Sequence, residues 1–307
     1  MVKLANKTSM RIISGTSNPD LAAKIAQNLN IPLVDTEISE FANGEKRVWI
    51  KEKLDGQDVV VVQSFSDPVD GHIMEFLLML DALERMGARD VHAIVPWMGY
   101  SLQDKVFRPG EAIAAKVVAR LISHAYVKRV YLIDVHNTSI PGFFDMPCSH
   151  LSAIELFAAD VRKRFDIKEI VVASPDFGGL KRARQFANLF DVPLVNIDKH
   201  RDLVTGKVTA LGLHGRVKGK IVVLFDDVIL SGGTVTEAGD MLKEEGAKEA
   251  HFYATHGLFT GAALANLQAS SMDSITVANT LAHPNMPKKI QALDLAPMLA
   301  ATLEEWF

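Results

Sequence analysis

The chain has 307 residues, enough for one large or two ordinary domains, and its 48% hydrophobic and 23% charged residues are typical of a globular protein. Its net charge of −4 disfavours general binding to nucleic acid, because proteins that bind the phosphate backbone usually carry a clear basic excess. A single cysteine, Cys148, excludes an internal disulfide and any metal site made of several cysteines. No apolar run is long enough for a secretion signal or a membrane span, so we expect a cytoplasmic protein with no membrane partner.

Apolar runs of strand length alternate along the chain with stretches whose apolar residues repeat at helical spacing. Strands that are apolar throughout, with helices between them, are typical of parallel sheets covered on both faces. The pattern therefore predicts an α/β protein built on mainly parallel sheets flanked by helices. The expected strands are 11–16, 59–65, 92–97, 130–133, 169–173, 221–225, 250–255 and 274–278, and the expected helices include 19–30, 74–88, 111–125, 180–190 and 234–247.

Two segments share one order of elements. The residues from Val59 and those from Ile221 each run from an apolar strand through a polar loop and a helix to a second strand. A duplicated domain explains this echo, although any two strand–helix–strand units look alike at this level. We expect one domain over residues 1–148 and a second over 149–307, with the C-terminal helix folding back from about Pro297.

The stretch "VVLFDDVILSGGT" predicts a loop that binds a sugar phosphate. Ligands of open α/β sheets bind beyond the carboxyl ends of the strands, where this loop begins. Glycines let the backbone approach an anion, and the first N–H groups of the following helix can bind it. Two acids would repel a phosphate unless they meet hydroxyls or a cation, and a ribose phosphate offers a vicinal diol. The alternative is a loop that only caps the next helix, but such a loop would not need the whole string. The polar and glycine positions are Asp226, Asp227, Ser231, Gly232, Gly233 and Thr234.

This string resembles the phosphoribosyl-binding loop of the type I phosphoribosyltransferase fold, which phosphoribosyltransferases share with ribose-phosphate diphosphokinases (PRPP synthetases). Further segments resemble the diphosphokinases in order and spacing from about Arg11 to Pro284: "FANGEKRVWI", "YSLQDKVFRPGEAIAAKVVARLI", "IDVHNTSIPGFFD", "VVASPDFGGLKRARQFA" and "NIDKHRD". Simple phosphoribosyltransferases lack the first half. The resemblance therefore favours a diphosphokinase with two tandem phosphoribosyltransferase-like domains.

The resemblance implies transfer of the diphosphate of Mg-ATP to the C1 hydroxyl of ribose 5-phosphate, giving PRPP and AMP. It implies ATP binding and oligomer contacts in the first domain, the ribose 5-phosphate loop and the catalytic loop in the second, and a homo-oligomer built from dimers. Lys199 and Arg201 are implied as catalytic residues, and His136 and Asp176 as ligands of Mg²⁺. The implied ATP-binding residues are Phe41, Asn43, Gly44, Glu45, Leu102, Gln103, Asp104 and Lys105, and the implied ribose 5-phosphate-binding residues are Arg201, Asp226, Asp227, Leu230, Ser231, Gly232, Gly233 and Thr234.

Four of these residues have simpler alternatives. His136 follows an apolar strand, and a lone histidine there is often a structural residue. Asp176 also follows a strand, where a carboxylate can bind Mg²⁺ or cap the next helix. Lys199 and Arg201 lie in a charged, glycine-containing stretch that ordinarily forms a solvated connection, but phosphoryl transfer needs cations delivered in this way. The resemblance favours the catalytic role for both.

Three positions depart from the family's pattern. Leu102 stands where the family usually has an arginine, which removes a charged phosphate contact that Lys105 or Arg108 would have to replace. Asn43 replaces the usual aspartate of "FANGEKRVWI", which the resemblance implies is the adenine segment, the part of the chain that recognises adenine. Leu230 stands where the family usually has a third acid in the sugar-phosphate loop. These changes leave open a catalytically weak or inactive relative that binds nucleotides and regulates a partner. A transferase that joins PRPP to a base is disfavoured by the adenine segment.

Overall fold

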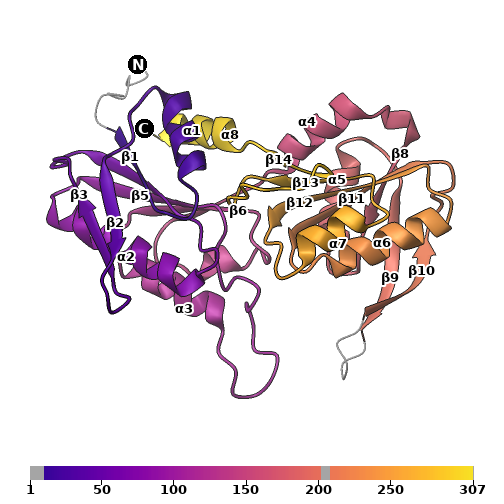
Figure 1. Ribbon diagram of the computed structural model, residues 1–307, viewed down its shortest axis with the longest axis horizontal. Coiled ribbons are helices and arrows are strands. Elements are labelled where there is room, and N and C mark those ends of the chain that lie inside the picture. The colour runs from indigo at the N-terminus through magenta and orange to yellow at the C-terminus, as the bar shows by residue number, and fades with distance from the viewer. Residues whose placement is uncertain (1–9, 202–207, 307) are drawn as a thin grey trace. The chain divides into compact units, whose positions relative to one another are not determined.

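The computed structural model describes residues 10–201 and 208–306, and of residues 198–201 and 208–211 only the backbone. These residues form two compact units, each built around its own sheet (Figure 1). The first unit contains residues 10–152, 280–282 and 294–306, and the second contains residues 153–279 and 283–293. The domain limits expected at residues 148 and 149 stay a prediction. The last helix, which that division assigns to the second domain, packs within the first unit.

The first unit is a five-stranded parallel sheet with the strand order β1-β4-β5-β6-β7. Two helices cover each of its faces, α1 and α8 on one and α2 and α3 on the other (Figure 1). A separate antiparallel hairpin, β2 and β3, precedes β4. The bounds are β1 (Met10–Ser14), α1 (Pro19–Leu29), β2 (Thr36–Glu40), β3 (Lys46–Ile50), β4 (Asp58–Val62), α2 (Val69–Arg85), β5 (Asp90–Val95), α3 (Ala114–Ser123), β6 (Arg129–Ile133), a 3₁₀ turn (Ile140–Phe143), β7 (Cys148–Leu151) and α8 (Ala296–Trp306).

Local sequence explains why α1 begins and ends where it does. Pro19 occupies the first turn, and the side chain of Asn18 accepts a hydrogen bond from the N–H of Leu21 at 3.3 Å. Asn30 ends the helix in the left-handed conformation with φ of 56°. The buried face of α1 packs against α8, and the ion pair of Lys24 with Asp294 at 3.5 Å flanks the contact. The predicted return of the C-terminal helix thus closes one face of the first sheet.

The second unit is a seven-stranded sheet with the order β10-β9-β8-β11-β12-β13-β14, parallel except for β10. Helices α4 and α5 cover one face and α6 and α7 the other (Figure 1). Below α5 the core is aromatic, since Phe186 stacks on Phe225 with ring centroids 4.4 Å apart. The bounds are α4 (Ile154–Arg164), a 3₁₀ turn (Ile167–Glu169), β8 (Ile170–Ser174), α5 (Leu180–Asn188), β9 (Leu194–Arg201), β10 (Val208–His214), β11 (Ile221–Ile229), α6 (Gly233–Glu244), β12 (Glu249–Gly257), α7 (Ala263–Ala269), β13 (Ser274–Ala278) and β14 (Ile290–Leu293).

The predicted fold class is confirmed, because both sheets are mainly parallel and flanked by helices. The two segments with a shared order of elements become β4-α2-β5 and β11-α6-β12, one in each unit. None of the helices within residues 10–201 and 208–306 has the length and apolar character that a membrane crossing requires.

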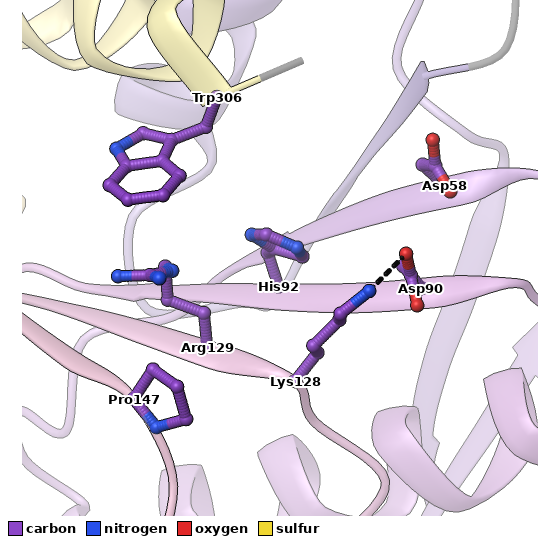
Figure 2. A pocket seen from close by; sticks show the side chains of 7 residues that line it. All are labelled: Asp58, Asp90, His92, Lys128, Arg129, Pro147 and Trp306. Atoms are coloured by element: carbon purple, nitrogen blue, oxygen red, sulfur yellow. Dashed lines mark hydrogen bonds and ion pairs between the residues drawn. The ribbon is translucent and has the colours of Figure 1, made fainter.

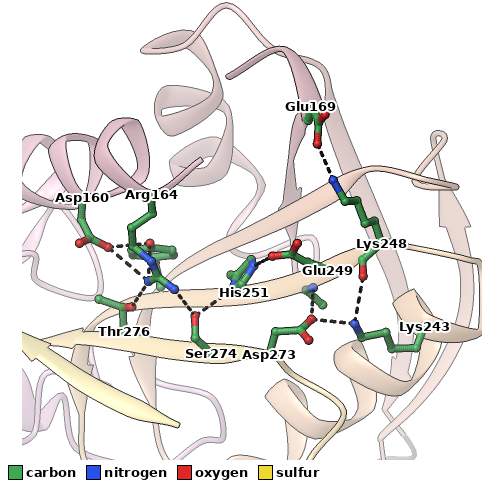
Figure 3. Close-up of polar contacts among 12 residues, drawn as sticks. Asp160, Arg164, Glu169, Lys243, Lys248, Glu249, His251, Asp273, Ser274 and Thr276 are labelled. Carbon is green, nitrogen blue, oxygen red and sulfur yellow. Dashed lines mark hydrogen bonds and ion pairs between the residues drawn. The ribbon is translucent and has the colours of Figure 1, made fainter. Parts of the chain in front are cut away.

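A polar network at the amino ends of β12 and β13 ties α4 to the second sheet (Figure 3). Arg164 donates to the hydroxyl of Tyr253 at 3.0 Å and to that of Ser274 at 2.8 Å, and it pairs with Asp160 at 3.4 Å. Tyr253 in turn donates to Asp160 at 2.7 Å. Because only 26% of the Arg164 side chain and 15% of the Asp160 side chain are exposed, losing one partner leaves the others poorly solvated.

We therefore expect Arg164→Ala to lower the free energy of unfolding by about 2 kcal/mol, since it removes the ion pair with Asp160 and the hydrogen bonds to the hydroxyls of Tyr253, Ser274 and Thr276. Urea denaturation at pH 7 measures this loss. Arg162→Ala on the same helix is the control, because Arg162 is exposed, stacks on the ring of Phe190 and donates to the carbonyl of Leu189. Equal losses in the two variants would contradict a specific role for the network.

A hollow of about 330 Å³ lies at the amino edge of the first sheet, beside the end of α8 (Figure 2). The guanidinium carbon of Arg129 lies 3.9 Å from the ring centre of Trp306, which joins the end of α8 to β6. Lys128 pairs with Asp90 at 2.6 Å across the mouth. The lining residues are Asp58, Asp90, His92, Lys128, Arg129, Pro147 and Trp306.

His92, at the floor of this hollow, gives the first unit a dependence on pH. The residue is 7% exposed, and burial lowers the pKa of His92 from 6.5 to about 4, with Asp90 opposing the shift. Because the folded pKa lies below the unfolded one, the contribution of His92 to stability is complete above pH 6.5 and is lost as the pH falls towards 4.

The wild type should lose stability between pH 7 and pH 4.5, and His92→Gln should lose about 2 kcal/mol less over the same range. Urea denaturation of both proteins at the two pH values gives the comparison. His124→Gln, which alters an exposed histidine at the end of α3, should behave as the wild type does. An unchanged pH dependence in His92→Gln would show that other groups cause the acid sensitivity.

Candidate functional site

The predicted sugar-phosphate loop lies at the carboxyl end of β11, between β8 and β12 in the second sheet. The strand extends to Ile229, so that Asp226 and Asp227 lie on its last part, where Asp226 pairs with Ala254 of β12. Helix α6 then begins at Gly233. Leu230 and Ser231 between them are exposed.

Gly232 sets the conformation of this loop. It precedes α6 with φ of 78°, in the left-handed region that disfavours a side chain, and a Cβ atom there would lie 2.9 Å from carbons of Leu267. Gly232 is the N-cap residue of α6 and, having no side chain, makes no side-chain cap hydrogen bond to the start of the helix. Such a helix start suits a phosphate, and the hydroxyls of Ser231 and Thr234 lie in the same turn.

An arginine that the sequence reasoning missed joins the acidic pair. Arg182, in the first turn of α5, places its Nη1 atom 3.1 Å from Oδ1 of Asp226 and 2.9 Å from Oδ1 of Asp227. The N–H of Asp227 donates to the same oxygen of Asp226 at 2.9 Å. The signal was present in the sequence, because two adjacent acids at the end of a buried strand require a cation.

The acidic pair is electrostatically strained. Burial and, to a smaller extent, the neighbouring carboxylate of Asp227 together raise the pKa of Asp226 to about 8, although the charge of Arg182 opposes both. The charge of Asp176 adds a smaller rise, which places that carboxylate near the pair. A carboxylate with such a pKa gains from a ligand that supplies hydroxyl donors or positive charge, because either favours its ionised form.

Asp176 caps the turn that leads from β8 into α5. Its Oδ1 atom accepts a hydrogen bond from the N–H of Gly179 at 2.9 Å, and Ser174 Oγ donates to its carbonyl at 2.6 Å. The N-cap residue of α5 is Gly179 and makes no side-chain cap bond, so Asp176 stabilises the turn before the helix and does not have the helix-capping role that the sequence left open. A Cβ atom on Gly179 would lie 3.3 Å from Oδ1 of Asp226 and 3.7 Å from Oδ1 of Asp176, so the two carboxylates flank this glycine.

In the first unit, the predicted phosphate-contacting residues lie in the loop between β5 and α3. Asp104 is 9% exposed and accepts a hydrogen bond from Asn137 Nδ2 at 2.6 Å, which ties this loop to the one that carries His136. His136 itself is exposed after β6. Gln103 and Lys105 are exposed and Leu102 is half-buried. The structure thus brings the His136 loop and the loop of residues 102–105 together at the carboxyl edge of the first sheet.

The predicted adenine segment is the turn of the β2-β3 hairpin. The N–H of Phe41 donates to the carbonyl of Glu45 at 2.8 Å, and Gly44 takes a positive φ of 87°. Asn43 Oδ1 accepts from the N–H of Glu45 at 3.3 Å, so Asn43 has a role in the turn itself. The Phe41 ring is 53% exposed and therefore open to a planar partner.

The side chains of the two predicted catalytic residues lie outside the described residues. Their backbone belongs to β9, where Lys199 pairs with Ala210 and Arg201 with Val208 of β10. In the part of the chain that is described, no group of three or more histidine, cysteine, aspartate or glutamate side chains is arranged to hold a metal ion.

A central parallel strand that ends in an acidic pair, followed by a glycine turn at a helix start, defines a protein of the phosphoribosyltransferase type. Residues 10–125 match the family model for the N-terminal domain of ribose phosphate pyrophosphokinase, and residues 149–287 match that for the phosphoribosyl transferase domain. The chain belongs to the ribose-phosphate pyrophosphokinase family, a family of transferases.

Relatives along nearly the whole chain agree with these matches. The ribose-phosphate pyrophosphokinase of Maricaulis maris is 38% identical over 297 residues, which cover 96% of this chain and 96% of that protein. That of Thermotoga maritima is 38% identical over 298 residues, covering 96% and 94%. The crystal structure of phosphoribosylpyrophosphate synthetase from Mycobacterium smegmatis superposes with a TM-score of 0.90 at 34% identity, covering 97% of this chain and 99% of that one. The resemblance found in the sequence is confirmed.

Proposed function

We propose that this chain is a ribose-phosphate diphosphokinase that forms PRPP and AMP from ATP and ribose 5-phosphate. The anomeric hydroxyl of ribose 5-phosphate attacks the β-phosphorus of ATP and loses its proton. The bond from that phosphorus to the oxygen bridging the α- and β-phosphates breaks, and AMP leaves with the bridging oxygen. The observation that carries the proposal is the acidic pair on β11 beside a glycine turn at the start of a helix, in a chain of this family.

The ribose 5-phosphate site is assigned to the second unit. The backbone of residues 230–234 and the hydroxyls of Ser231 and Thr234 bind the 5-phosphate at the start of α6. Asp226 and Asp227 accept hydrogen bonds from the ribose hydroxyls, and these bonds favour the ionised form of Asp226. Leu230 is 40% exposed at the rim of this loop and supplies no acid, so the sugar is bound by two carboxylates.

The ATP site is assigned to the first unit. Phe41 at the hairpin turn offers a ring to the adenine, and Gln103 and Lys105 contact the phosphates. Compensation for Leu102 by Lys105 or Arg108 stays a prediction. The exposed position of Lys105 supports this prediction, and its Nζ atom lies 5.1 Å from the ring centre of Phe107.

Lys199 and Arg201 are assigned to the transferring diphosphoryl group, where fixed positive charge favours the transition state. We assign Mg²⁺ as the metal ion, and His136 in the first unit and Asp176 in the second are each assigned as a residue that would bind such an ion. An exposed imidazole and a half-buried carboxylate beside Asp226 are suitable donors. When bound, the ion neutralises phosphate charge. A cytoplasmic homo-oligomer built from dimers completes the proposal and rests on the family resemblance.

Incubation of the purified protein with ATP, ribose 5-phosphate and Mg²⁺ tests the reaction. We expect AMP and PRPP to appear in equal amounts, with ribose 5-phosphate required for AMP release. A protein that binds ATP but shows no turnover at saturating substrates would instead be a regulatory relative. Consumption of added PRPP with a purine or pyrimidine base would indicate a transferase of the other class.

A further inference from the structure

We propose that Arg182 is the positioning residue of the ribose site, holding Asp226 and Asp227 side by side so that both carboxylates face the sugar hydroxyls. The inference rests on the proposed function, because the ligand it concerns is ribose 5-phosphate. Arg182 acts through the two acids and does not itself touch the reacting atoms.

The contacts are specific to the acidic pair. One nitrogen, Nη1 of Arg182, lies within 3.1 Å of an oxygen of each carboxylate. The side chains of Arg182, Asp226 and Asp227 are 24%, 15% and 4% exposed, so water screens this cluster poorly. Charge-assisted hydrogen bonds in such surroundings fix side-chain direction as well as stabilise it.

Without the arginine the two neighbouring carboxylates would lose the cation that binds both of them. Like charges at this separation repel, and a nearly buried carboxylate such as Asp227 has little water to replace a lost partner. The acids would then turn apart or keep a proton between them. Either change removes acceptors that the ribose hydroxyls need.

The place of Arg182 on α5 links it to the other acid of the site. The N–H of Gly179, just before α5, binds Asp176, and Arg182 follows one turn later. The start of a single helix therefore positions all three carboxylates, Asp176 through its backbone and the acidic pair through its arginine. A plain structural ion pair between α5 and β11 would share the geometry but would predict no effect confined to one substrate.

Two neutral variants test the role, Arg182→Gln and Arg182→Met, with Arg182→Lys as the conservative replacement. Isothermal titration with ribose 5-phosphate, without ATP, gives the affinity directly. We expect the dissociation constant to rise about 30-fold in both neutral variants and to be partly restored in Arg182→Lys. In turnover, KM for ribose 5-phosphate should rise by a similar factor, while KM for ATP stays within about twofold.

Arg184→Gln is the matched control, because Arg184 is an exposed residue on the same helix and the variant loses the same charge. It should bind ribose 5-phosphate as the wild type does. Unchanged affinity in a folded neutral variant would overturn the proposal, as would an equal rise in both KM values. Failure of both neutral variants to fold would assign the arginine to stability instead. A wild type that makes no PRPP would overturn the proposed function alone, because the titration requires no turnover.

Discussion

Replacing Gly232 by alanine is expected to weaken the binding of ribose 5-phosphate by about 100-fold. The left-handed backbone at this position disfavours a side chain, and the added Cβ would press against Leu267 at 2.9 Å. Relieving the backbone strain or the contact with Leu267 would rotate the peptide groups that lead into α6. Because those N–H groups are assigned to the 5-phosphate, the loss should appear in the affinity for ribose 5-phosphate and in its KM.

Gly219→Ala is the control for backbone strain. Gly219 also has a positive φ, of 72°, but a Cβ there would meet nothing within 4 Å, and the residue lies in the turn before β11. Gly219→Ala should lose stability through backbone strain alone, and Gly232→Ala should lose more because of the added contact with Leu267. Only Gly232→Ala should lose affinity for ribose 5-phosphate. Normal ribose 5-phosphate affinity in Gly232→Ala would mean that the 5-phosphate binds elsewhere.

The largest effect on turnover is expected from Lys199→Ala. An ammonium group on the diphosphoryl group favours charge that develops only during transfer, so its removal should lower kcat by about 100- to 1,000-fold. The dissociation constants of ATP and ribose 5-phosphate should change little. Steady-state assays of AMP release, together with binding titrations, separate the two effects.

Lys218→Ala, which removes the same charge from an exposed residue of the second unit, should leave kcat unchanged. An equal fall in both variants would point to a general electrostatic effect. A Lys199→Ala variant with normal kcat would remove the residue from the reaction.

The sequence predicted the strands whose own residues are apolar throughout, because such strands are buried on both faces. The apolar runs of β4, β5 and β6 lie between two helical layers, so continuous hydrophobicity marks them. The hairpin of β2 and β3 was missed because its residues, such as Glu37 and Arg47, are charged and partly exposed. The short edge strand β14 was missed for a similar reason, with Gln291 exposed in its middle.

The candidate site divides in the same way. The loop from Asp226 to Thr234 could be recognised because its chemistry lies within one continuous stretch. The acidic pair indicated that a cation is needed but not that Arg182 supplies it, since the contact of Arg182 with Asp226 joins residues 44 positions apart along the chain. The bond between Asp104 and Asn137 spans 33 positions and was likewise invisible. Contacts of this kind depend on strand order, which periodicity does not determine.

The placement of α8 has a consequence for how the chain folds during synthesis. Leu299 and Leu303 are fully buried within the first unit, yet they leave the ribosome after every residue of the second unit. The second unit is therefore an insertion in the first. The apolar face of α1 cannot pack against α8 until the whole second unit has been synthesised. The nascent first unit should depend on chaperones longer than the second, although it is translated earlier.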